Sequence, residues 1–277
     1  MSIVTDEVCE NCEYEGLVEF VNKQGHYLLR CPQCDLYQKG FLDAGSSVHY
    51  GRETDTVYES NYHTHYAKRL PAKKMTAMIR LGAAARYMPQ GARILDVGCS
   101  IGATLRSAVK LGWNPTGVDI SQAAVDYCRK DGLDAYKVDG HQLPFEDGTF
   151  DLVTNWHVIE HIPYVMDAIA EWRRVLKPGG VLMLETPASN FYKAKKLGLA
   201  HLKFWPPDHV YTFNRNNLSS MLKKSGYEIL PTRLTGGLTK LRPNMTLYAM
   251  AYRGYRETCR RFNLCKSFEL TCRKPAA

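Results

Sequence analysis

Segments of strand length alternate with segments of helical periodicity along most of this 277-residue chain. Between residues 72 and 87, apolar side chains recur on one helical face, which predicts a helix that ends before Pro89. A second amphipathic helix is expected over Asn217–Ser225. Strands are expected at 94–97, 115–119, up to 139, 150–155, up to 188, from 226, and at 245–252. This alternation predicts an α/β fold built on a doubly wound sheet.

Two cysteine pairs near the N-terminus have the spacing of a zinc site. Cys9 and Cys12 form one C-x2-C pair, Cys31 and Cys34 form another, and eighteen residues separate the pairs. Two such knuckles complete a closed, tetrahedral site with no open position, so the zinc should be structural. Residues 1–45, with two short strands around a turn, should form a zinc ribbon that needs the metal as a staple. The alternative is four unrelated free thiols.

The segment 46–74 is too polar for a core and too aromatic for a free linker. It is rich in tyrosine and histidine, including Tyr62, His63 and Tyr66. One interpretation is a surface patch that docks the ribbon on the main domain. The other is a lid, with one of these three side chains reaching a ligand.

The strand at 94–97 carries Asp96 and leads through Gly98, Cys99, Ser100 and Gly102 into a helix. Such a turn of small residues lets a ligand approach the backbone closely. A dinucleotide fingerprint would need glycine at position 100, and a phosphate-binding loop would need Gly-Lys-Ser/Thr, which is absent. The next strand ends in Asp119, where a doubly wound fold binds a ribose diol.

This loop resembles motif I of class I S-adenosylmethionine (SAM) methyltransferases, D-x-G-C-G-x-G, with Ser100 as one departure small enough to fit the turn. The later landmarks of that family follow in order, and the resemblance covers roughly 75–252. It implies a Rossmann-like sheet of seven strands, the seventh antiparallel. An NAD enzyme or an inactive scaffold is the alternative. The resemblance implies SAM contacts from Asp96, Gly98, Cys99, Ser100, Gly102, Asp119, Ile120, Asp139, Gly140, Asn155 and Tyr62.

The block Pro206–Phe213 is similar to one in bacterial zinc-ribbon methyltransferases related to the ubiquinone-biosynthesis O-methyltransferases. That resemblance implies methyl transfer to a small molecule or a sugar or glycan precursor. An insert from Ser189 to Asp208 should form one wall of the acceptor pocket, with Phe204 and Trp205 offering flat apolar surface.

A hydroxyl acceptor needs a general base, and histidine is suited because its pKa lies near working pH. Three histidines follow strand ends that should border the crevice: His157 and His161 after the fourth strand, and His209 after the insert. We expect His209 to take the proton, with His157 and His161 as the other candidates. Related quinone O-methyltransferases hold a divalent cation near Glu160 and His161, but His157 stands where those enzymes carry Glu, so we do not expect a catalytic metal.

The formal net charge of +8 does not indicate a nucleic-acid partner. Residues 253–277 hold seven Lys and Arg against two Glu, which predicts a basic C-terminal tail and leaves the rest of the chain close to neutral. An RNA or protein methyltransferase that reads its substrate with the zinc ribbon remains the alternative. The N-terminus lacks a secretory signal and no run suits a membrane span, so we expect a cytoplasmic protein. The oligomeric state is left open.

Overall fold

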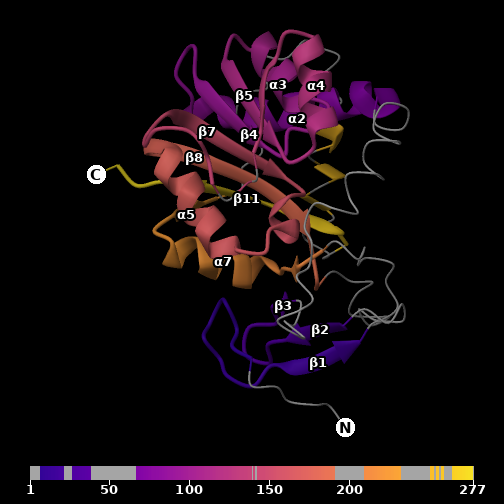
Figure 1. Cartoon of the computed structure of the whole chain (residues 1–277), viewed down its shortest axis with the longest axis vertical. Helices are drawn as coiled ribbons and strands as arrows, with labels where there is room; N and C mark the ends of the chain where they lie inside the picture. Colours follow the sequence, from indigo (N-terminus) through magenta and orange to yellow (C-terminus); the bar gives the residue numbers. More distant parts are fainter. Residues whose placement is uncertain are drawn as a thin grey trace.

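The computed structural model describes residues 7–21, 27–38, 67–138, 140, 142–190, 209–231, 250–252, 254–255, 257–258 and 264–276. They form two sheets, a large one at the centre of the molecule and a small one at its N-terminal end (Figure 1). No helix in this described part is long and apolar enough to cross a bilayer.

The large sheet has seven strands in the order β10-β11-β8-β7-β4-β5-β6. Neighbouring strands from β8 to β6 pair in parallel, whereas β11 runs antiparallel to both β8 and β10. The predicted doubly wound sheet with an antiparallel seventh strand is therefore confirmed. The strands are β4 (Arg93–Val97), β5 (Asn114–Asp119), β6 (Asp134–Lys137), β7 (Phe150–Trp156), β8 (Leu176–Pro187), β10 (Glu228–Leu230) and β11 (Ser267–Arg273).

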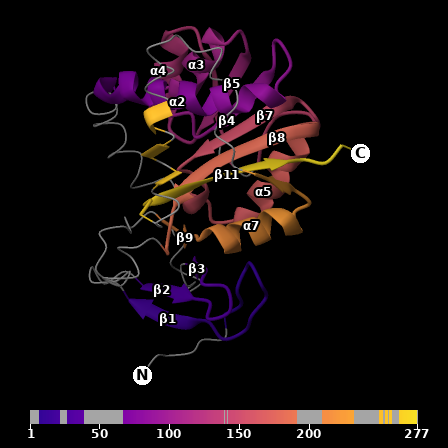
Figure 2. The ribbon, with the colours of Figure 1, turned by 180° about the vertical axis from the view of Figure 1, so that it is seen from behind.

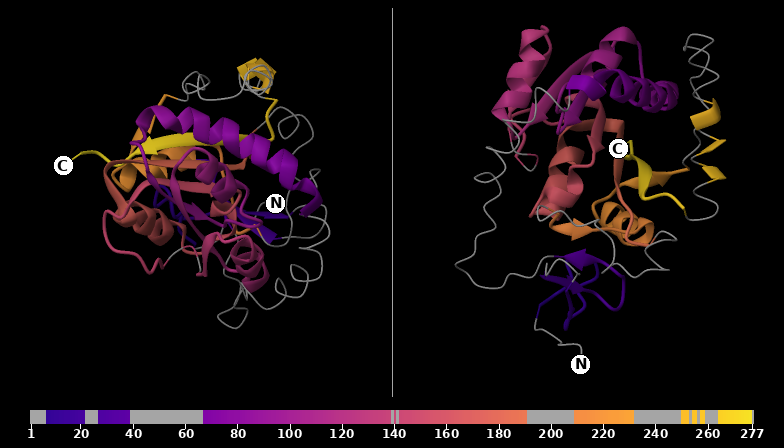
Figure 3. Two further views of the ribbon diagram at one scale, coloured as in Figure 1. Left: turned by 90° about the horizontal axis from the view of Figure 1, so that it is seen from above. Right: turned by 90° about the vertical axis from the view of Figure 1, so that its right-hand side faces the viewer.

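Helices cover both faces of this sheet (Figure 3). Apolar side chains of α2 and α3 pack with Ile94 and Leu152 on one face, whereas those of α5 and α7 pack with Leu95 and Val153 on the other. Adjacent residues of a strand point to opposite faces, so a strand buried on both sides is apolar throughout. The helices are α2 (Leu70–Ala84), α3 (Ala103–Lys110), α4 (Gln122–Lys130), α5 (Val165–Val175) and α7 (Arg215–Lys224), with short 3-10 turns η2 (Ala67–Arg69), η3 (Ala85–Tyr87) and η4 (Ile159–His161).

The seventh strand does not lie where the sequence predicted it. It spans Ser267–Arg273, inside the expected basic tail, whereas residues 250–252 are helical. The prediction of a tail at 253–277 was wrong because charged residues there are satisfied in the fold. Glu269 pairs with Arg80 of α2, and Lys274 donates to the carbonyl of Leu176. A strand between β8 and β10 can hold charges at positions where a neighbour neutralises them.

The small sheet joins the N-terminal unit to the main domain. Strands β1 (Val18–Val21), β2 (Tyr27–Arg30) and β3 (Tyr37–Gln38) are antiparallel neighbours, and β9 (Tyr211–Thr212) of the main domain adds a fourth strand beside β3. Seen from behind, β3 and β9 lie together where the two parts meet (Figure 2). We call residues 7–38 the cysteine ribbon. Its buried residues belong to the same apolar cluster as α5 and α7, so ribbon and main domain share one core.

Candidate functional site

The loop after β4 lies against the end of β5, where Gly117 leaves room for the side chain of Cys99. The amides of Gly98 and Cys99 both donate to the carbonyl of Val118, at 2.8 and 3.0 Å. A Cβ added to Gly117 would lie 2.8 Å from both Cys99 and Leu105. The Cys99 thiol is accordingly buried, so this residue can meet a ligand only through its backbone.

Three positions of this loop, Gly98, Ser100 and Gly102, adopt the left-handed backbone that favours glycine. Gly98 has φ +74°, and an added Cβ would lie 2.2 Å from Val158, in the turn after β7. Ser100 has φ 51°, which explains why the family motif carries glycine at this place. Serine is accommodated there, as the sequence predicted, but at a cost in backbone strain.

Asp119 ties the loop to the end of β5. Its Oδ2 accepts the amide of Ser100 at 2.8 Å, and its Oδ1 accepts the amide of Ser121 at 2.9 Å. Burial raises the pKa of Asp119, and these backbone N–H groups oppose that rise. Each carboxylate oxygen retains lone pairs that can accept a ribose hydroxyl. Ile120, which is 37% exposed beside it, offers an apolar surface of the kind that an adenine ring needs.

Asp96 lies deeper, at 2% exposure, and its Oδ1 accepts the Thr154 hydroxyl at 2.6 Å. Burial raises the pKa of Asp96 to about 7. Lys73 of α2 lies close enough for its charge to favour ionisation of both Asp96 and Asp119, while its own burial lowers the pKa of Lys73. This lysine had no motif to reveal it from the sequence.

The other predicted SAM residues differ in how far the structure describes them. Gly140 accepts the indole N–H of Trp172 at 2.8 Å and lies near Val97. Asn155 is fully buried, and its Oδ1 accepts the amide of Ile159 at 3.2 Å, so it shapes the turn after β7. Tyr62 and Asp139 lie outside the described residues, as do His63, Tyr66, Phe204 and Trp205. For Tyr62 and Asp139 SAM contact stays a prediction, as do the lid at His63 and Tyr66 and the acceptor-pocket wall at Phe204 and Trp205.

His157 lies in the turn after β7, between two buried carboxylates. Its Nδ1 is 3.3 Å from Glu160 Oε1, and its Nε2 is 3.5 Å from Glu185 Oε2. The imidazole is 47% exposed, whereas both glutamates are almost inaccessible. Its backbone has φ 58°, in the left-handed region that residues other than glycine adopt uncommonly.

Glu185 belongs to a charge network that sequence reasoning missed. Arg80 of α2 pairs with Glu185 of β8 and with Glu269 of β11, and its guanidinium lies 4.3 Å over the ring of Trp156. The Ser267 hydroxyl donates to Glu185 Oε1 at 2.6 Å. A carboxylate inside the apolar run of β8 was the one available signal, since a buried acid needs a partner.

Glu160 also lies beside the other two histidines. One potential metal-ligand atom from each of Glu160, His161 and His209 lies within 4.8 Å of the others. The two imidazole rings meet edge to face, with their centroids 4.6 Å apart. One carboxylate and two imidazoles suit a divalent cation. Both Glu160 oxygens already have neighbours, since Oε2 accepts the Thr186 hydroxyl at 2.9 Å and Oε1 faces His157. His209 is 9% exposed and borders this group rather than open space.

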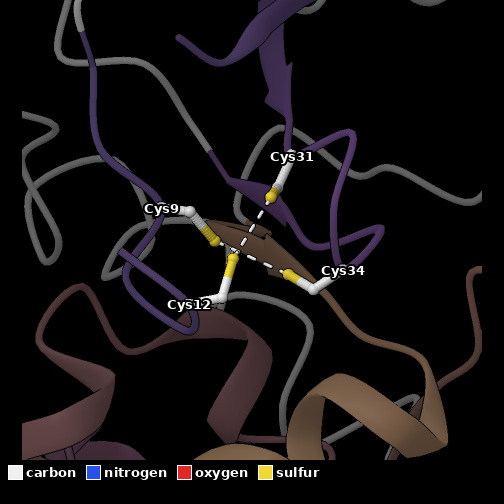
Figure 4. A group of neighbouring side chains, drawn as sticks. All are labelled: Cys9, Cys12, Cys31 and Cys34. Atoms are coloured by element: carbon white, nitrogen blue, oxygen red, sulfur yellow. Dashed lines mark hydrogen bonds between the residues drawn. The ribbon is translucent and has the colours of Figure 1, made fainter. Parts of the chain in front are cut away.

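The four ribbon cysteines point toward one centre (Figure 4). Cys9 Sγ lies 3.6 Å from Cys34 Sγ, and Cys12 Sγ lies 3.5 Å from Cys31 Sγ. A tetrahedral zinc with Zn–S bonds of about 2.3 Å separates its sulfurs by about 3.8 Å, whereas a disulfide would bring them to about 2.05 Å. The donor set therefore fits zinc. The hydrogen bond between the two thiols lowers the pKa of Cys34 and so favours its thiolate.

Asp96 predicts a pH dependence of stability. Its pKa is raised in the folded state, so the folded protein binds this proton more tightly, and the contribution of Asp96 to stability falls as pH rises from about 4 to about 7. We expect the free energy of unfolding of Asp96→Asn, relative to that of wild type, to rise by up to about 4 kcal/mol as the pH is raised from 4 to 8. Urea unfolding of both proteins across this range measures the difference. A difference that is constant across this range would contradict the prediction.

The cysteine cluster predicts the metal content of the protein. We expect one zinc per chain by plasma mass spectrometry, and Cys31→Ser should lose most of it because a three-thiolate site is incomplete. Cys272→Ser is the matched control, since this buried thiol of β11 lies outside the cluster. Equal zinc in both variants would show that the cluster is not the metal site.

Comparison with known proteins agrees with this geometry. The chain is 35% identical over 159 residues to the ubiquinone biosynthesis O-methyltransferase of Nitrosococcus oceani, covering 53% of this chain and 66% of that protein. It is 30% identical to the protein of the same name from Aromatoleum aromaticum, over 50% and 64% of the two chains. The chain thus spans just under two thirds of these relatives' length.

Solved structures share the fold. A SAM-dependent methyltransferase of Thermotoga maritima superposes with a TM-score of 0.51 at 16% identity, covering 79% of this chain and 99% of that one. The [4+2]-cyclase SpnF superposes with a TM-score of 0.50 at 26% identity, covering 72% and 81%. The family model described as "Methyltransferase domain" matches residues 63–232, more than half of the chain. The chain belongs to the class I SAM-dependent methyltransferase family.

Proposed function

We propose that this protein transfers the methyl group of SAM to a hydroxyl of a small molecule, a class that includes sugar and glycan precursors, and that His157 acts as the general base. The observation that carries the proposal is the position of His157. It adjoins Val158, the residue packed on Gly98 of the predicted SAM loop, and its half-exposed imidazole is held by buried carboxylates.

The buried carboxylates assign different tasks to the two nitrogens of His157. Glu185 is already neutralised by Arg80 and accepts the Ser267 hydroxyl, so it does not depend on the imidazole. Glu160 Oε1 faces Nδ1 and can accept its N–H, which fixes the tautomer and leaves the Nε2 lone pair as the base. Glu160 would then stabilise the imidazolium that forms when Nε2 takes the acceptor's proton.

Bound SAM supplies an electrophilic methyl group, which an oxygen attacks in line with the sulfur–carbon bond. The chain's own task is to orient the acceptor and remove its proton. His209 was the first candidate from the sequence, and that assignment remains untested. Its burial against His161 and Glu160 favours a supporting role on the acceptor side. The same three residues could hold a divalent cation, which would lower the pKa of an acceptor hydroxyl.

The relatives named ubiquinone biosynthesis O-methyltransferase support an O-methyl acceptor. The cysteine ribbon, which we propose holds a structural zinc, supports the small-molecule choice over an RNA or protein substrate. Its knuckle residue Cys34 accepts hydrogen bonds from Asn214 and Asn217 of the main domain, so this side of the ribbon is covered by the fold.

Methyl transfer can be tested without knowing the acceptor. Purified protein is incubated with methyl-tritiated SAM and a cell extract separated into small molecules, RNA and protein. We expect label in the small-molecule fraction. Asp119→Ala should abolish it, because losing a bidentate ribose contact worth about 2–3 kcal/mol weakens SAM binding about 30-fold or more by calorimetry. Asp134→Ala, at the amino-terminal end of the neighbouring strand β6 and bonded to Thr116, should bind SAM as wild type does.

Label in RNA or protein would instead favour the ribbon as a substrate reader. Label in no fraction would refute methyl transfer by this chain, an outcome to be considered since a [4+2]-cyclase shares the fold. SAM affinity unchanged in a folded Asp119→Ala would refute the assignment of β5 to ribose binding.

The base is tested by comparing two histidine variants in the labelling assay. His157→Ala should lower kcat about 10²–10⁴-fold, the range typical of a lost general base, and leave SAM affinity within about twofold. The loss should shrink at high pH, where the acceptor ionises without help. His209→Ala should cost less. If His209→Ala abolishes turnover while His157→Ala does not, the sequence-based choice of His209 is the correct one.

A further inference from the structure

The segment 209–214 is held between the cysteine ribbon and the acceptor side of the main domain. On the main-domain side, the Val210 amide donates to the Glu160 carbonyl at 2.8 Å, and the Ser189 amide donates to the Phe213 carbonyl at 2.7 Å. Glu160 and the end of β8 are thereby connected to the same short stretch of backbone. His209 is its first residue.

On the ribbon side, the same stretch contacts both cysteine knuckles. Strand β9 pairs with β3, with Tyr37 opposite Thr212 and Gln38 opposite Tyr211. Asn214 and Asn217 each donate a side-chain N–H to the Cys34 carbonyl at 3.3 Å. These two asparagines also form the capping box of α7, so the N-terminus of that helix is built directly on the second knuckle.

Tyr211 links the first knuckle to the turn after η4. Its hydroxyl oxygen lies 2.6 Å from Glu10 Oε1, between Cys9 and Cys12, and 2.7 Å from the Pro163 carbonyl. The ring is 1% exposed and stacks near Phe213, with centroids 5.7 Å apart. At the other end of α7, Lys224 donates to the Asn11 carbonyl of the same knuckle.

We propose that the cysteine ribbon positions the acceptor side of the site. Tyr211 is the positioning residue, because it connects the ribbon to the stretch of backbone that holds His209 and Glu160 in place. The proposal rests on the proposed function for its kinetic consequence. A ribbon of this size has too small a core to be rigid alone, so its thiolate site fixes the knuckles. Fixed knuckles hold β9 and the cap of α7, and these hold residues 209–214.

Hydrogen exchange of the full-length protein tests the proposal without turnover. Tyr211→Phe keeps the ring and all four cysteines but removes the hydroxyl. We expect it to retain its zinc and its SAM affinity within about twofold, while amides 209–214 exchange about tenfold faster and those of β4 stay unchanged. Metal removal by a chelator should produce the same local pattern, more strongly.

Tyr227→Phe is the matched control. It removes another buried tyrosine hydroxyl, which donates to the Ile169 carbonyl at 3.4 Å in the main core, and should leave amides 209–214 protected. Glu10→Gln keeps a carbonyl to accept from Tyr211 and should behave as wild type, whereas Glu10→Ala should resemble Tyr211→Phe. In the labelling assay, Tyr211→Phe should lower the transfer rate about tenfold.

Unchanged exchange at 209–214 in both Tyr211→Phe and the chelated protein would overturn the proposal. An equal rise in β4 would overturn it too, because it would indicate general loss of stability instead of local positioning. Failure of wild type to label any fraction would refute the proposed function alone, since the exchange measurement needs neither acceptor nor methyl transfer.

Discussion

The close approach of three backbone segments at the carboxyl edge of the sheet determines the site. The loop after β4 packs on β5 where Gly117 has no Cβ, and the turn after β7 packs on the loop where Gly98 has none. Because the two glycines leave room for the side chains of Cys99 and Val158, the loop can lie close enough for the amides of Gly98, Cys99 and Ser100 to bind Val118 and Asp119 directly. One bulky residue at Gly98 or Gly117 would push these segments apart and separate the SAM side from His157.

This packing has an electrostatic cost, which helps to explain the chemistry of the site. Asp96, Glu160 and Glu185 are buried where ionised carboxylates are poorly solvated, and the raised pKa of Asp96 reflects that burial. Arg80 neutralises Glu185 and Glu269, but it lies on the β8–β11 side of the sheet. Lys73, near the N-terminal end of α2, interacts electrostatically with Asp96 and Asp119 and favours their ionised forms. A ligand carrying an ammonium and a sulfonium group supplies positive charge, which favours the ionised form of buried carboxylates.

The sequence could predict what is local. Short apolar runs predict strands β4, β5 and β7, and the glycine spacing predicts the loop after β4. The spacing of the cysteines predicts their grouping into one site. The sequence could not predict the contact of Arg80 with Glu269, because 189 residues separate them. For the same reason β11 looked like a charged tail. The surroundings of the histidines were also hidden, since His157 meets Glu160 and Glu185, and His209 meets His161, only in the folded chain.

The cysteine ribbon combines a feature that the sequence predicts with contacts that only the fold shows. Cysteine spacing predicts a metal site, but only the fold places Cys34 beneath the asparagines that cap α7. Because β9 and α7 follow His209 directly, the strand pairing and hydrogen bonds of the ribbon reach one short stretch of the main domain. The apolar residues of the ribbon also join the cluster under α5. A ribbon meant to reach outward for a macromolecule would gain little from such contacts, whereas one that holds residues 209–214 in place depends on them.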